Sequence, residues 1–204
     1  KNKRVKMYPV LSSFLIVFVL FYEKYHCIKW LRGICHRFDN YEITKDYFYL
    51  QRFINYTTVA SYLAILSSLY TIATGQLPPP DIMVMVWNQT FTITMGYWIM
   101  VYPDTWSNND PRNYYLDTLQ HGPVLILYTY QISYYHNPFT MLGLIYSFIY
   151  GYFYLFFIWI PYYYLTGDPI YKVMNGGIVK KIGIISIINL ICLCGQIIGL
   201  YLFS

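Results

Sequence analysis

The chain has 204 residues, of which 57% are hydrophobic and only 11% are charged, and its formal net charge is +5. Soluble domains carry about a quarter charged residues, so this composition excludes an ordinary soluble domain. No acidic or basic tract is long enough to predict a nucleic acid partner. The sequence therefore indicates an integral membrane protein.

Long apolar runs separated by polar connections recur along the chain. A transmembrane helix needs about 20 predominantly apolar residues, and most of the runs approach that length. We therefore predict an all-α fold, a polytopic membrane bundle of about six transmembrane helices that forms one domain over residues 1–204. The predicted spans are Tyr8–Tyr22, Phe53–Ala73, Ile82–Tyr102, Tyr114–Ser133, Phe139–Tyr163 and Ile182–Phe203.

The first run is the shortest, and the polar segment Glu23–Arg52 follows it. If all the runs cross, the odd-numbered loops hold most of the Lys and Arg and lie inside by the positive-inside rule. The basic N-terminus, Lys1–Lys6, argues for the opposite orientation. The orientation therefore stays open, and so does the choice between an endomembrane and the mitochondrial inner membrane.

The second predicted span carries small side chains at helical spacing, which allow two membrane helices to approach closely. This stripe consists of Thr57, Ser61, Ala64 and Ser68. Helix packing is one interpretation, and the other makes Thr57 or Thr58 a hydroxyl nucleophile. Asn55, at the head of the span, is predicted either to cap the helix or to stabilise an oxyanion.

An acid and an imidazole lie one helical turn apart in the fourth predicted span. Asp117 and His121 share a helix face, and ionisable residues at membrane depth usually face the bundle interior and mark function. A carboxylate that accepts from one imidazole nitrogen orients the ring and leaves the other as a base. A structural polar network between helices, or a headgroup position for Asp117, is the alternative.

The second and fourth predicted spans leave from the same membrane face. At about 1.5 Å rise per residue, Thr57 lies roughly 6 Å and His121 roughly 10 Å inside their spans. Similar depth would allow Thr57 or Thr58 to approach His121. The sequence alone does not show whether these two helices touch.

The C-terminal half resembles the androgen-induced-gene family, which includes the androgen-dependent TFPI-regulating protein. The resembling elements are Met100–Pro103, Leu116–His121, Val124-Leu125, His136–Pro138, Gly151-Tyr152, Thr166-Gly167 and Tyr171. The resemblance implies a multi-span hydrolase of fatty acid esters of hydroxy fatty acids, with a Thr nucleophile and a His base.

By this resemblance His121 corresponds to the catalytic His of the family. The Asn-His pair that precedes it in the family is Asp117-Thr118 here. The nucleophilic Thr of the family follows a Phe-Leu pair, whereas here Phe53-Ile54 is followed by Asn55, with Thr57 and Thr58 shortly after.

Two functions of different kinds follow from the sequence. The first is an intramembrane lipid-ester hydrolase without a cofactor, whose partners are membrane lipids. The second is a non-catalytic accessory subunit of a larger membrane complex, such as a protist mitochondrial respiratory assembly. No metal site is predicted, because the spacing of His26-Cys27 and Cys35-His36 matches no usual zinc motif.

Overall fold

The computed structural model describes residues 7–34, 55–101, 121–167, 174 and 176–204, with side chains from residue 7 to 22 in the first helix. Every regular element in these ranges is a helix, which confirms the all-α prediction. The elements, with η for a π-helical stretch, are α2 (Met7–Ile34), α4 (Tyr56–Thr74), α5 (Pro80–Gly96), η1 (Tyr97–Val101), α8 (Pro123–Ile132), α9 (Met141–Tyr154), η2 (Leu155–Trp159), α10 (Ile160–Thr166) and α11 (Ile178–Phe203).

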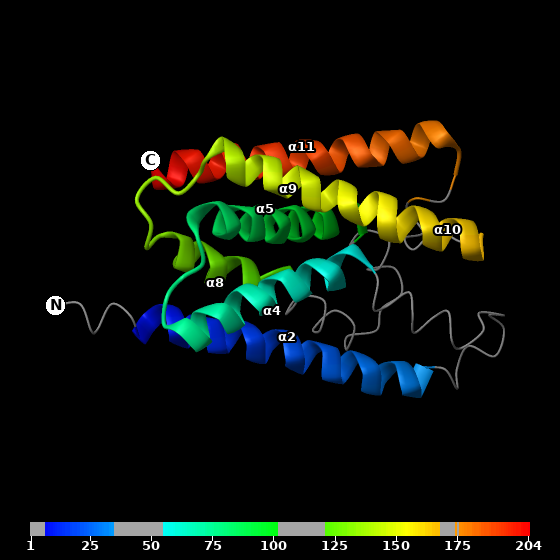
Figure 1. Ribbon diagram of the computed structural model, residues 1–204. Helices are drawn as coiled ribbons and strands as arrows, with labels where there is room; N and C mark the ends of the chain where they lie inside the picture. Colours follow the sequence, from blue (N-terminus) through cyan, green and yellow to red (C-terminus); the bar gives the residue numbers. More distant parts are fainter. Residues whose placement is uncertain (1–6, 35–54, 102–120, 168–173, 175) are drawn as a thin grey trace.

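Helix α5 lies at the centre of the bundle (Figure 1). It packs against α4 and α8 on one side and against α9 and α11 on the other, and α2 covers α4 and α8. The buried ring of Trp87 stacks on Phe91 with 5.2 Å between centroids and meets Phe139 edge-on at 5.1 Å. These aromatic contacts form the middle of the hydrophobic core.

Buried amide side chains tie the outer helices to α5. The Asn88 Nδ2 group donates to Ser147 Oγ of α9 at 3.1 Å and to Gln196 Oε1 of α11 at 2.9 Å. Gln89 Nε2 donates to the Ser147 carbonyl at 2.7 Å. Polar groups away from water need partners inside the protein, so these bonds fix how α9 and α11 sit on α5.

Helix α4 begins at Tyr56, three residues after the predicted start at Phe53. Asn55 has an extended backbone (φ −64°, ψ 151°), and its side chain accepts from the backbone N–H of Thr58 at 2.8 Å. At the other end, Gly75 takes the left-handed conformation (φ 66°) that favours glycine at a helix terminus. Asn55 and Gly75 therefore set the length of this helix.

Helix α2 continues to Ile34, beyond the predicted end of the first span at Tyr22. The polar residues Glu23–Arg52 were expected to form a connection. However, residues 23–32 include neither Pro nor Gly, so the backbone there is free to remain helical despite its polar side chains.

One helical stretch runs without interruption from Met141 to Thr166 and is widened to π geometry over η2. Pro161 is the second residue after η2 and has no N–H to donate to the carbonyl of Phe157. A π-turn is one of the ways in which a helix accommodates such a lost bond. The stretch ends at Gly167, whose φ of 73° and N–H bond to the Tyr163 carbonyl close the last turn.

Within the described ranges, three helical stretches are long and apolar enough to cross a membrane, namely Tyr56–Thr74, Met141–Thr166 and Ile178–Phe203. Shorter apolar helices cover Met7–Tyr22 and Pro123–Ile132. These three stretches indicate a membrane-embedded protein. The larger number of spans stays a prediction.

Candidate functional site

His121 is buried at the end of the bundle where α5 finishes, with 4% of its surface exposed. Its ring lies flat on the ring of Tyr97, with 4.0 Å between centroids and 3° between planes. Such stacking occupies the faces of the imidazole, while hydrogen bonds to its nitrogens lie in the plane of the ring. The contact with Tyr97 therefore restrains the ring without occupying the directions in which it exchanges protons.

The π-helical stretch η1 supplies both residues that hold His121 in place. Tyr97 is its first residue, and Trp98 Nε1 donates to the His121 carbonyl at 3.2 Å. The Tyr97 and Trp98 rings are themselves packed edge to face at 5.4 Å. Single π-turns occur frequently at functional sites, because they reorient side chains relative to a regular helix. Here the turn presents two neighbouring aromatic side chains to one histidine.

The other three described candidates lie in the first turn of α4 or directly before it. Thr58 is buried, with 1% of its surface exposed, and Thr57 beside it is half-buried. The Asn55 side-chain oxygen caps the helix, which supports the capping interpretation of this residue. Thr57 and Thr58 are therefore in the first helical turn, shallower in the span than predicted.

Hydrogen bonds from Tyr128 join α8 to α4. The Tyr128 hydroxyl donates to the Ala64 carbonyl at 2.6 Å and lies 3.1 Å from Ser68 Oγ. Residues about seven apart share one face of a helix, so Thr57 lies on the same face of α4 as Ala64. The small-residue stripe of α4 thus faces α8 at Tyr128, as the packing interpretation predicts.

Two further contacts give the relative heights of α4 and α8 along α5. Ser67 Oγ donates to Met83 Sδ at 3.6 Å, and Trp87 Nε1 donates to Thr129 Oγ1 at 3.0 Å. Helices α4 and α8 both run antiparallel to α5 (Figure 1). The residues that precede Ser67 in α4 and Thr129 in α8 therefore lie progressively nearer the C-terminal end of α5. At 1.5 Å per helical residue, Thr57 and Pro123, the first residue of α8, then lie at about the same height, and His121 precedes Pro123 by two residues.

The start of α4 is fixed to two other helices by a residue that the sequence interpretation missed. The Tyr56 hydroxyl donates to Gln89 Oε1, and the Tyr56 ring packs on Tyr154 with 4.8 Å between centroids. Gln89 was detectable in principle, as an amide in the middle of an apolar span. The pairings of Tyr56 and Tyr97 were not, because 26 tyrosines give the sequence too many equivalent candidates.

Of the predicted Asp117–His121 pair, the structure describes only His121, because Asp117 lies outside the described residues. The expected continuous helix over Tyr114–Ser133 is wrong at Gly122, whose φ of −137° and ψ of −74° are not helical. Pro123 follows, and a residue before proline is driven out of the helical region. His121 is therefore separated from α8 by one non-helical residue.

The described arrangement suits proton transfer to or from a hydroxyl. It holds an orientated imidazole, two threonine hydroxyls at a similar height and an amide at the head of the same helix. Within the described ranges, no three His, Cys, Asp or Glu side chains come together as a metal-binding group. No family model, curated protein or solved structure matches the chain.

Proposed function

We propose that the chain is an intramembrane hydrolase of fatty acyl esters, with Thr57 as nucleophile and His121 as base. The proposal rests on one observation above all. The Tyr128 bonds to Ala64 and Ser68 turn the Thr57 face of α4 toward the segment that carries His121, at a similar height. The resemblance to the androgen-induced-gene family points to the same pair of residue types.

In this mechanism the Thr57 Oγ1 attacks the ester carbonyl while His121 takes the hydroxyl proton. His121 then returns the proton to the departing alcohol, which leaves an acyl-threonine ester. Water, deprotonated by the same imidazole, hydrolyses that ester and regenerates the hydroxyl. While its Oδ1 caps the helix, the side-chain Nδ2–H of Asn55 would donate to the developing oxyanion, and Asp117 would orient the imidazole.

The burial of the site favours this mechanism, because it restrains the imidazole and limits contact with water. The flat contact with Tyr97 restrains the imidazole before substrate arrives. A water-poor surrounding strengthens every charge interaction that develops in the transition state. The span Tyr56–Thr74 is long and apolar enough to cross a membrane, and in this proposal the acyl chain of the substrate enters from the lipid phase.

Replacing Thr57 with valine is expected to abolish ester hydrolysis, because valine keeps the shape of threonine and lacks the attacking hydroxyl. The measurement is release of fatty acid from an ester of a hydroxy fatty acid by the purified chain in neutral detergent. Thr58→Val is the matched control, since it removes the neighbouring hydroxyl from the same turn. Full activity in Thr57→Val, or equal loss in both variants, would contradict the assignment of Thr57.

The alternative function, a non-catalytic accessory subunit of a larger membrane complex, is favoured by a different observation. Only 17% of the most apolar window of Met141–Thr166 is buried inside the chain, so this span has little cover of its own. A neighbouring subunit would cover it in an assembly. Co-purification at fixed stoichiometry from mild detergent, together with no esterase activity in the wild-type chain, would favour this function over hydrolysis.

A further inference from the structure

The outer face of α9 and η2 carries a groove of about 410 Å³ between two rows of rings. Tyr152 and Phe156 stack on one side with 6.3 Å between centroids, and Phe153 and Phe157 stack on the other with 4.9 Å. Phe156 is typical of these walls, with 57% of its surface exposed. The groove lies within a stretch that is apolar enough to cross a membrane, so its surroundings are hydrocarbon.

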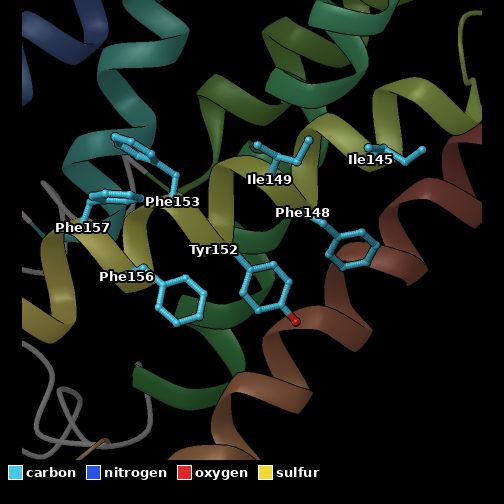
Figure 2. Close-up of a pocket in the computed structure, with 7 residues that line it drawn as sticks. All are labelled: Ile145, Phe148, Ile149, Tyr152, Phe153, Phe156 and Phe157. Carbon is cyan, nitrogen blue, oxygen red and sulfur yellow. The ribbon is translucent and has the colours of Figure 1, made fainter.

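The two sides of the groove differ in what they face. Figure 2 shows the rings of Phe148, Tyr152 and Phe156 pointing toward α11, while Phe153 and Phe157 point away from it. The side toward α11 ends in a polar contact, since Asn189 Nδ2 of α11 donates to the Tyr152 hydroxyl at 3.1 Å. This side therefore follows the seam between α9 and α11.

Beyond the groove, α10 and the first turns of α11 lie further apart (Figure 1), and the buried side chains of Trp159, Tyr162 and Ile184 pack together between them. Lys181 of α11 lies over this end of the seam, with its ammonium 3.9 Å from the Tyr163 ring centroid and 5.8 Å from that of Trp159. Trp159 and Tyr163 are stacked on each other at 5.7 Å. A cation over two aromatic rings at the end of a span is held at one height.

The mouth of the seam carries positive charge without a described counterion. Among the described residues, Lys181 forms no ion pair, and the first turn of α11 has no acidic residue. The N-terminus of α11 follows Gly177 without a side-chain cap. The Trp159 indole, 6% exposed beneath Lys181, has an Nε1–H with no acceptor in the part of the chain that the structure describes. Each of these features favours an anion with acceptor oxygens.

We propose that an anionic phospholipid binds in the seam between α9–α10 and α11. Its phosphate lies at Lys181, and one acyl chain lies along the Tyr152 and Phe156 side of the groove. Charge selects the head group, because a lysine near the membrane surface attracts anionic lipid, and the rings provide the apolar contact. This site is separate from Thr57 and His121, so the proposal is independent of ester hydrolysis.

Native mass spectrometry of the full chain tests the site, with phosphatidylglycerol and phosphatidylcholine of identical acyl chains added at equal concentration. We expect wild-type protein to retain phosphatidylglycerol preferentially. Lys181→Gln should lower that preference by about five-fold, the contribution of one lysine at a membrane surface. Lys180→Gln is the matched control, since it removes the same charge from an exposed neighbour and should retain most of the preference. Lys181→Arg should retain it as well.

The groove is tested with a second matched pair. Phe156→Ala, on the side toward α11, should weaken phosphatidylglycerol retention several-fold, whereas Ile126→Ala, an exposed apolar position on α8 outside the groove, should leave it near the wild-type level. Glycerol 1-phosphate, which has the head group without chains, should not displace the lipid. Equal retention of both lipids, equal losses in the Lys180 and Lys181 variants, equal losses in the Phe156 and Ile126 variants, or displacement by glycerol 1-phosphate would each overturn the proposal. A protein dimer that buries Phe156 and excludes lipid would overturn it too.

Discussion

Replacing His121 with alanine is expected to lower ester turnover by about 10²–10⁴-fold, the usual contribution of a general base. The imidazole is buried against Tyr97, the first residue after α5. Without it, the proposed reaction loses the base that takes the proton from the Thr57 hydroxyl. The measurement is the rate of fatty acid release by purified protein at saturating substrate.

His136→Ala is the control for this variant. His136 is exposed in the connection between α8 and α9, at the other end of the bundle, and takes no part in the proposed reaction. It should therefore keep wild-type turnover. Thermal unfolding of both variants distinguishes lost chemistry from a lost fold. Wild-type turnover in a folded His121→Ala protein would remove the proposed base.

Replacing Gly143 with alanine is expected to destabilise the fold by about 1–3 kcal/mol, as overpacking does in a filled core. A Cβ atom at this position would lie 2.6 Å from Val84 Cγ1 and 2.7 Å from Val84 Cβ. The branched Val84 side chain on the buried central helix cannot swing aside, so α9 would have to move off α5. The expected result is a lower thermal midpoint in detergent.

Gly183→Ala is the matched substitution in another helix. A Cβ atom at Gly183 would meet nothing within 4 Å, and the position is exposed on α11. Alanine is the better helix former by about 1 kcal/mol, so this variant should be as stable as wild type or more stable. Equal midpoints for the two variants would show that α5 and α9 are not in the close contact described.

The helical class of the fold was predictable, because it follows from hydrophobic content and the length of the apolar runs. The position of α5 was not predictable in the same way. The hydropathy of α5 is no higher than that of its neighbours. The polar run Asn88-Gln89-Thr90 within it would be expected at an exposed position, although it is buried. What makes it central is that these side chains find partners on helices distant in sequence, such as Ser147 and Gln196.

In the candidate site too, the features set by neighbouring residues were predictable, and the contacts between residues distant in sequence were not. Local chemistry predicted that Asn55 is able to cap a helix, and the structure shows the cap. The break in the helix at Gly122 was predictable from the proline that follows it, although the surrounding apolar run favoured a continuous helix. The contact between Tyr97 and His121 depends on the π-turn at the end of α5. No local pattern in the sequence predicts that turn.

Covalent capture with an alkyl phosphonofluoridate tests the central claim, a Thr–His hydrolytic pair, most directly. The Thr57 oxygen would form a bond to phosphorus, fluoride would leave, and the hydroxyl proton would pass to His121. Peptide mass spectrometry should find one adduct, on Thr57, in wild-type protein and none in His121→Ala. The absence of any adduct in folded wild-type protein, an adduct on a different residue, or an adduct that persists in His121→Ala would contradict the account.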